Sequence, residues 1–191
     1  MLSLALCMCM LVVASADGPT KKPNEYAENQ DHFSDQILSH MTDVSEKLFV
    51  RQRDYDTNTT NRCHSAKKVE SKDDGTFTYQ LSTRTEDGQT ISFIVPMTPT
   101  KTGQHQVPNA AKYDDDKSGK EVDHKLMTMD SGYTCFVFSR ELLDGNFGCV
   151  LAQTWSTVDN GVPEKCQSVY NSQCGKDSVT LYDSSCKTGD Q

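Results

Sequence analysis

The stretch that decides the fold runs from Tyr133 to Cys174. It begins Tyr133-Thr134-Cys135-Phe136-Val137-Phe138-Ser139, turns at Asp144-Gly145-Asn146, and continues Phe147-Gly148-Cys149-Val150-Leu151-Ala152-Gln153-Thr154-Trp155. Two alternating runs around a Gly-containing turn predict a β-hairpin. Each strand carries one cysteine, and the segment after Pro163, a short helix-like run ending at Cys174, carries two more. A hairpin fastened to a following helix covers the free edge of a β-structure.

The N-terminal sequence has the form of a secretory signal. Residues 1–16 are an apolar run that ends in Ala14-Ser15-Ala16, small residues of the kind found at a cleavage site. The run is shorter than the ~20 residues that a membrane-spanning helix needs. In this chain of 191 residues we predict a signal peptide at 1–16, a flexible polar lead at 17–30 and one barrel domain at 31–191.

The cysteine count fits an exported protein. Two of the eight cysteines, Cys7 and Cys9, lie in the predicted signal peptide, and six remain. An even number in an exported chain indicates three disulfides, whose pairing the count alone leaves open. Asn58-Thr59-Thr60 is a glycosylation sequon and predicts an exposed loop. The formal net charge of −8 argues against nucleic acid and against anionic membrane surfaces as partners.

One amphipathic helix is predicted ahead of the strands. Phe33, Ile37, Met41 and Val44 recur at helical spacing, which predicts a helix over about 31–44 with its apolar face on the rest of the fold.

The middle of the chain predicts an all-β fold. After a first strand near 47–51, residues alternate with a period of two through about eight short strands, most of them separated by Asp-Gly or Ser-Gly turns. We expect Pro96 and Pro99 to end the strand that contains Ile91, and 98–108 to form a longer loop. The pattern indicates an antiparallel up-and-down barrel or a sandwich, and the flanking helices favour a barrel wide enough for one small ligand.

The order and spacing of several motifs resemble those of a known family. The motifs are Cys63, Cys135, Gly148-Cys149-Val150-Leu151, the run Val158-Asp159-Asn160-Gly161-Val162-Pro163-Glu164-Lys165-Cys166, Tyr170, Cys174-Gly175 and Cys186. They resemble the tick salivary lipocalins, the group that includes the histamine-binding proteins. The resemblance implies an eight-stranded lipocalin barrel with an N-terminal helix across one end and a C-terminal helix packed outside. It also implies three disulfides, Cys63–Cys186, Cys135–Cys166 and Cys149–Cys174.

In its family form, the amine site is absent from this chain. In amine-binding members an Asp follows the cysteine that corresponds to Cys135, and the next strand carries Glu-Leu-Trp or Glu-Leu-Tyr. Here Phe136 takes the place of the Asp, Val150 that of the Glu and Ala152 that of the aromatic residue. A cation in a low-dielectric barrel needs a buried carboxylate, and losing one partner of a buried pair costs ~3–5 kcal/mol, on the order of 10²–10³ in affinity.

A second amine site elsewhere in the barrel stays open at this point. Its candidate carboxylates are Glu46, Asp54, Asp123 and Glu141, although most charged strand residues are solvated.

The remaining lumen is expected to be apolar and aromatic. If Cys135 bonds an outer helix, alternation turns Phe136 and Phe138 inward. The residues that we expect to bind a ligand are Phe77, Tyr79, Phe93, Phe136, Phe138 and Val150. Such a wall suits a fatty acid, an eicosanoid or a steroid; the alternative is that these side chains fill the barrel and leave no cavity. His124 and Lys125 are candidates to meet a ligand carboxylate, with ordinary strand residues as the alternative.

Three classes of function are compatible with parts of this sequence. The first is a secreted monomer that sequesters a small host mediator, lipid or biogenic amine, and so suppresses inflammation. The second is a binder of a host defence protein such as complement through the loops at 98–108 and 142–146. The third, an enzyme, has little support because the chain lacks Gly-x-Ser-x-Gly, His-Glu-x-x-His and phosphate-loop motifs, and all six cysteines are assigned to bridges. We predict no catalytic residue, cofactor or metal.

Overall fold

A closed β-barrel forms the body of the protein. The computed structural model describes residues 22–188, so the predicted signal peptide and residues 17–21 of the lead lie outside the described part. The barrel strands are β1 (Leu48–Arg53), β2 (Arg62–Ser71), β3 (Phe77–Arg84), β4 (Thr90–Thr100), β5 (Ala110–Tyr113), β6 (Val122–Met129), β7 (Cys135–Glu141) and β8 (Phe147–Thr154).

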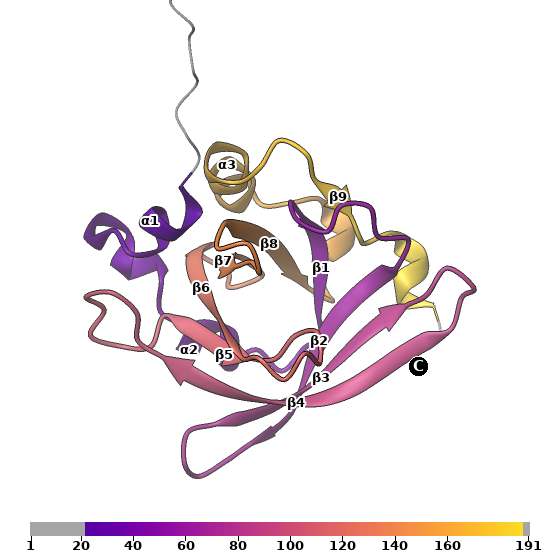
Figure 1. Cartoon of the computed structure of the whole chain (residues 1–191), viewed down its shortest axis with the longest axis horizontal. Coiled ribbons are helices and arrows are strands. Elements are labelled where there is room, and N and C mark those ends of the chain that lie inside the picture. Colours follow the sequence, from indigo (N-terminus) through magenta and orange to yellow (C-terminus); the bar gives the residue numbers. More distant parts are fainter. Residues whose placement is uncertain (1–21, 189–191) are drawn as a thin grey trace, which may run out of the picture.

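Pairing between the first and last strands closes the barrel. Consecutive strands pair antiparallel from β2 to β8, β8 then pairs with β1, and β1 pairs with β2 (Figure 1). The eight strands therefore form a ring, which confirms the predicted up-and-down barrel and rules out the sandwich. The predicted hairpin is β7 and β8, with Phe138 opposite Val150. Its turn contains Gly145 at φ 80°, a left-handed conformation that glycine adopts without strain.

Two prolines lie inside β4 instead of ending it, so that part of the prediction is wrong. Pro96 pairs with Thr78 of β3, in a part of β4 that has no partner on the β5 side. Pro99 pairs with Ala111 of β5, beyond the end of the β3 pairing. At each proline, β4 therefore has a neighbouring strand on one side only. On the other side there is no strand to accept a hydrogen bond, so the missing backbone N–H of the proline breaks no pairing there. The loop to β5 is correspondingly shorter than 98–108.

Short helices replace the single helix predicted over 31–44. They are α1 (Pro23–Ala27), the 3₁₀ helix η1 (Gln30–Asp35) and α2 (Ser39–Thr42). Gln36, fully buried, separates η1 from α2, and its side-chain amide donates to the carbonyl oxygens of Tyr26 and Met127. The predicted flexible lead is also wrong for residues 23–30, because α1 packs on β6, β7 and β8 and buries Ala27 completely.

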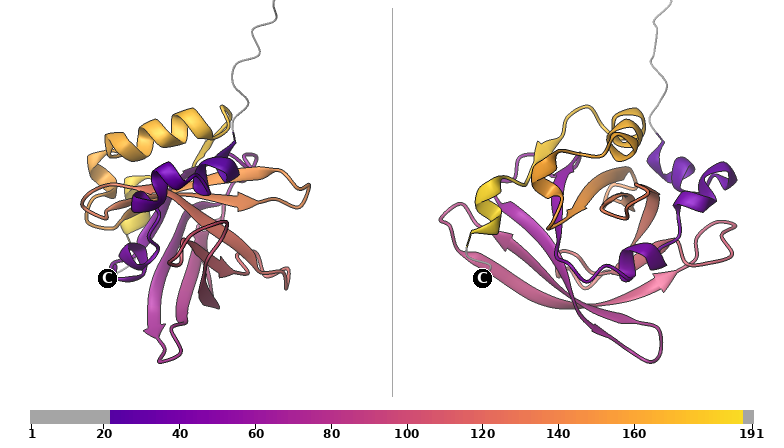
Figure 2. Two further views of the ribbon diagram at one scale, coloured as in Figure 1. Left: turned by 90° about the vertical axis from the view of Figure 1, so that its left-hand side faces the viewer. Right: turned by 180° about the vertical axis from the view of Figure 1, so that it is seen from behind.

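The C-terminal part wraps the outside of the barrel. After the 3₁₀ helix η2 (Val158–Asn160), α3 (Glu164–Gln173) crosses the outer surface of β6, β7 and β8 (Figure 2). The short strand β9 (Val179–Thr180) pairs with β1, and the 3₁₀ helix η3 (Ser184–Lys187) ends the described chain. No helix within 22–188 has the length and apolarity to cross a membrane.

The three disulfides join the pairs that the family resemblance implies. Cys135–Cys166 and Cys149–Cys174 fasten β7 and β8 to the two ends of α3. Cys63–Cys186 ties η3 to β2. Asn58 of the sequon is exposed in the loop between β1 and β2.

Alternation along the strands separates two apolar cores. The inner core, inside the barrel, includes Phe136 and Phe138, whereas the outer core, beneath α3, includes Cys135 and Val137. The predicted inward direction of the two phenylalanines is therefore the direction the structure shows. The strands place an apolar wall inside the ring, and the candidate site lies against that wall.

Candidate functional site

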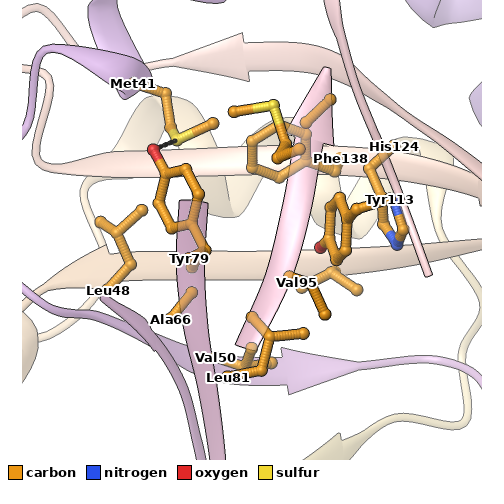
Figure 3. A pocket seen from close by; sticks show the side chains of 14 residues that line it. Met41, Leu48, Val50, Ala66, Tyr79, Leu81, Val95, Tyr113, His124 and Phe138 are labelled. Carbon is orange, nitrogen blue, oxygen red and sulfur yellow. Dashed lines mark hydrogen bonds between the residues drawn. The ribbon is translucent and has the colours of Figure 1, made fainter. Parts of the chain in front are cut away.

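An apolar chamber lies inside the barrel. It has a volume of about 80 Å³. Its lining comes from α2 and all eight strands: Met41, Leu48, Val50, Ala66, Tyr79, Leu81, Val95, Met97, Ala111, Tyr113, His124, Phe138, Val150 and Ala152 (Figure 3). None of these residues is Asp or Glu. Burying an ion without a partner is costly, so the chamber favours uncharged groups.

Tyr79 lines the chamber and not the mouth, unlike the other polar lining residues, Tyr113 and His124. Its hydroxyl donates to Met41 Sδ at 3.7 Å, which links β3 to α2 (Figure 3). Burial, with the negative charge of Asp43, raises the pKa of Tyr79 well above its usual range. The hydroxyl therefore stays protonated and neutral.

The chamber opens into a wide polar mouth. The mouth has a volume of about 670 Å³. It shares six lining residues with the chamber, so the two spaces are continuous: Val50, Ala66, Leu81, Tyr113, His124 and Val150. The charged residues that line the mouth are two arginines and four aspartates: Arg53, Arg140, Asp56, Asp115, Asp116 and Asp144.

Three polar side chains, Asp115, His124 and Arg140, meet where the chamber opens; we call them the neck cluster. Arg140 Nη1 and His124 Nε2 both contact Asp115 Oδ2, the imidazole at 3.3 Å. Only 17%, 5% and 10% of the Asp115, His124 and Arg140 side chains are exposed. His124 also stacks on Tyr113, with ring centroids 4.1 Å apart. The cluster is thus fixed on three strands or their ends.

Asp115 is anionic in this position. Burial alone would raise the pKa of its carboxyl group, but the hydrogen bond from His124 and the charge of Arg140 outweigh burial and lower the pKa. A negative carboxylate and a positive guanidinium therefore neutralise each other at the neck.

Tyr55 fills the side of the mouth next to the neck cluster. Its ring lies between two guanidiniums, with Arg53 Cζ at 5.0 Å and Arg140 Cζ at 5.2 Å from the ring centroid. Such cation–π contacts are favourable when the cations are shielded from water. Arg53 is in turn paired with Asp56 at 2.5 Å.

The six residues that we expect to bind a ligand take different positions. Tyr79 and Phe138 line the chamber, Val150 lines both spaces, and Phe93 lines the mouth. Phe136 faces the barrel interior but is fully buried in the inner core, and Phe77 packs at the edge of that core. The last two residues shape the floor and wall without lining the cavity.

Five candidate polar residues point away from the cavity. Lys125 lies outside the barrel, where its Nζ contacts Glu28 and Asn24, so it does not meet a ligand there. The four candidate carboxylates for a second amine site, Glu46, Asp54, Asp123 and Glu141, do not line either space.

Their contacts explain those positions. Glu46 accepts hydrogen bonds from Ser156, Asp54 from the backbone of Cys149 and Gly175, and Asp123 from Thr100. The carboxylate that does reach the neck is Asp115, which the sequence analysis missed.

The alternation of residues along the strands could have indicated both Asp115 and Arg140, neither of which was predicted as a site residue. Asp115 follows the lining residues Ala111 and Tyr113 at a period of two, and Arg140 likewise follows Phe136 and Phe138. The run of three aspartates at 114–116 obscured this signal, because such runs are normally solvated turns.

The sequence matches the tick histamine-binding protein family over residues 25–188. This chain belongs to that family. Among curated proteins, none matches the sequence significantly.

Similar solved structures show the same fold. Japanin from Rhipicephalus appendiculatus, bound to cholesterol, has a TM-score of 0.58 and 18% identity, over 75% of this chain and 96% of Japanin. Lobster apocrustacyanin A1 has a TM-score of 0.53 and 13% identity, over 91% and 94%. H1 crustacyanin from the lobster Homarus americanus has a TM-score of 0.52 and 12% identity, over 76% and 81%. At these identities the likeness concerns the lipocalin fold alone.

Family and fold together give the general character of the protein. Both are those of binding proteins that hold small ligands, and the family with its three disulfides is that of an extracellular protein. At the two positions where the family resemblance implies acids in amine-binding members, Phe136 and Val150 face the barrel interior and supply no charge.

Proposed function

We propose that this protein is secreted and captures a small host mediator inside its barrel, lowering the free concentration of that mediator and suppressing inflammation. We further propose that the mediator is an apolar molecule, such as a steroid or an eicosanoid, and not a biogenic amine. The observation that carries the proposal is the chamber itself, whose described lining contains no carboxylate. An amine cation would lose its hydration there without gaining a partner.

The size of the two spaces supports a ligand that reaches from one to the other. The chamber, at about 80 Å³, is small against the 300–1,000 Å³ of typical ligand sites, whereas the mouth reaches about 670 Å³. An apolar molecule would place one end against Phe138 and Tyr79 and extend toward Phe93. Histamine would leave most of this length unused.

Titration calorimetry with histamine, serotonin, a leukotriene and a sterol tests this function. We expect an apolar ligand to bind with micromolar or tighter affinity, and histamine to bind at least about a hundredfold more weakly than a nanomolar amine site would. Nanomolar histamine binding would contradict the proposal.

A pair of matched variants locates the site. Val150→Phe fills the chamber and is expected to abolish apolar binding. Val69→Phe makes the same change on a side chain that is 57% exposed and is expected to bind like the unchanged protein. Equal binding by both variants would place the ligand outside the barrel.

A second candidate function is binding to a host defence protein through surface loops. Leu143 in the loop at 142–146 is 85% exposed, and Val107 in the β4–β5 loop is 47% exposed. Exposed apolar side chains of this kind mark contact sites when they gather on one surface. Pull-down from host plasma tests this function: the unchanged protein would retain a defined partner and Leu143→Ser would not, whereas an empty pull-down counts against it.

A further inference from the structure

The protein fills its own anion-binding position at the neck. Arg140 and His124 converge on one carboxylate oxygen, and that carboxylate belongs to Asp115 of the loop between β5 and β6. In Figure 1 this loop extends from β5 toward β2 and β3 in the lower part of the ring. Lys117 of the same loop lies over the Phe93 ring, 4.4 Å from its centroid, so the loop contacts β4 as well as β7. Asp115 is thus held where the head group of a ligand in the chamber would lie.

The charges around the mouth leave no guanidinium available to an acid. Both arginines among the mouth-lining residues are paired with carboxylates of this chain, Arg140 with Asp115 and Arg53 with Asp56. A ligand carboxylate at the neck would therefore meet Asp115 as a like charge in a buried place, where repulsion is weakly screened.

The same charges give little to an amine. Asp115 is already neutralised by Arg140, and the unpaired carboxylates at the mouth, Asp116 and Asp144, are exposed at the rim. An exposed ion pair contributes little to affinity, while an ammonium in the chamber would still be buried without a partner. Neither sign of charge is favoured at the position where the apolar chamber ends.

We infer that Asp115 determines the charge class of the ligand: by occupying the anion-binding position of Arg140 and His124, it makes the barrel prefer apolar molecules with an uncharged head group, such as alcohols, over carboxylates. Among the proposed ligands this favours a sterol over a leukotriene or another eicosanoid, because eicosanoids carry a carboxylate. This inference rests on the proposed capture of an apolar ligand in the barrel. It assigns Asp115 a role in specificity. Removing its charge converts the neck into a site for acids, because Arg140 is then left as a buried cation whose remaining contacts, the Tyr55 ring and the Glu141 carbonyl oxygen, carry no negative charge.

Three ligands that share the same kind of alkyl chain and differ in the charge of their head group test the inference: octanol, octanoate and octylammonium. Each is titrated into the protein by calorimetry near neutral pH. In the unchanged protein, octanol is expected to bind at least about tenfold more tightly than either ion. In Asp115→Asn, octanoate is expected to gain at least about tenfold while octanol changes little. Asp73→Asn instead removes an exposed carboxylate from the β2–β3 turn, which lines neither space, and is expected to leave the order of the three ligands unchanged.

A double variant shows whether the gain comes from Arg140. Asp115→Asn combined with Arg140→Met removes both charges, and octanoate is expected to bind as weakly as in the unchanged protein. Thermal unfolding of each variant reports whether it is folded. Should Asp115→Asn fail to fold, the double variant and the order of the three ligands in the unchanged protein still decide the matter.

The titrations with the three ligands can contradict this inference without contradicting the proposed function. Octanoate binding as tightly as octanol in the unchanged protein overturns the inference, as does octylammonium binding most tightly and weakening in Asp115→Asn. In either case apolar capture stands. If none of the three ligands binds, and Val150→Phe has no effect on the leukotriene or the sterol, apolar capture fails and the inference fails with it.

Discussion

Gly148 sets the position of Tyr55, and through it the packing of both arginines at the mouth. A Cβ atom at Gly148 would lie 2.5 Å from Tyr55 Cδ1 and 3.0 Å from its Cγ, closer than side-chain carbons approach in proteins. The glycine is buried in β8, so the tyrosine ring rests directly on the strand backbone. This close approach is what lets the ring lie between Arg53 and Arg140.

Gly148→Ala is therefore expected to destabilise the protein by ~1–3 kcal/mol, the usual cost of overpacking. Urea unfolding measures the change. Combined with Tyr55→Ala, the alanine at 148 should add little further loss, because the ring it clashes with is gone. Additive losses in the double variant would show that Tyr55 is not the neighbour that matters.

His64 gives the stability a pH dependence of its own. Burial, together with the charge of Arg53, lowers the pKa of His64 from 6.5 to about 4. Between pH 6.5 and about 4 the imidazole of the unfolded chain binds a proton that the folded chain does not bind. The contribution of His64 to the free energy of unfolding is therefore complete above pH 6.5 and is lost as the pH falls toward 4. The loss amounts to roughly 3 kcal/mol at most. Asp115 is an acid whose pKa is lowered in the folded protein. Its contribution to the free energy of unfolding is lost only at more acidic pH, as the pH falls through its folded-state pKa.

His64→Gln is expected to remove most of this loss. Unfolding free energies measured in urea at several pH values between 6.5 and 4 should fall less steeply in the variant than in the unchanged protein. A slope that His64→Gln leaves intact would assign the dependence to other groups.

At the scale of elements, the sequence predicts the strands well and the N-terminal helices poorly. Period-two alternation specifies a strand with one buried face, so β7 and β8 appear close to the bounds predicted for the two strands of the hairpin. The helical spacing of Phe33, Ile37, Met41 and Val44 is present, but Gln36 and Leu38 are the fully buried residues. The Gln36 side chain hydrogen-bonds to the backbone of Met127 in β6, and such a tertiary contact overrides local periodicity.

Part of the candidate site could likewise be predicted from the sequence, and part could not. The apolar lining residues Tyr79, Phe138 and Val150 follow from alternation, which is a local property of each strand. The neck cluster requires residues from the ends of three strands to meet, and only the closed ring determines that meeting. Charged residues just past a strand end are usually solvated, so the pattern alone could not single out Asp115.

Among the covalent links between elements, the bridge from β2 to η3 closes the longest loop. Its cysteines, Cys63 and Cys186, are 123 residues apart, against 25 for Cys149 and Cys174. On the chain-entropy model, replacing the first pair by alanine costs about 5 kcal/mol and the second about 3.5 kcal/mol. Urea unfolding of the two double variants should show that order of stability. Equal losses would indicate structure in the unfolded chain near one of the bridges.

At the scale of the whole molecule, the features that would attract a charged ligand differ from those that would retain it. The chain carries a net charge of −8, and four aspartates line the mouth against two arginines. This field reaches ~30 Å at 0.01 M salt and less than ~10 Å above 0.1 M, so at low salt it draws cations toward the barrel. We propose that retention depends instead on the chamber, whose described lining contains no carboxylate.

Association and dissociation should therefore respond differently to salt. By stopped-flow fluorescence with a displaced apolar dye, the association rate of octylammonium is expected to fall several-fold between 0.01 and about 0.3 M salt, while that of octanol stays constant. The dissociation rate of octylammonium should exceed that of octanol at every salt concentration, because the chamber offers the cation no partner. Slow, salt-independent release of octylammonium would mean that a carboxylate inside the barrel holds it, and the neutral character assigned to the neck would be wrong.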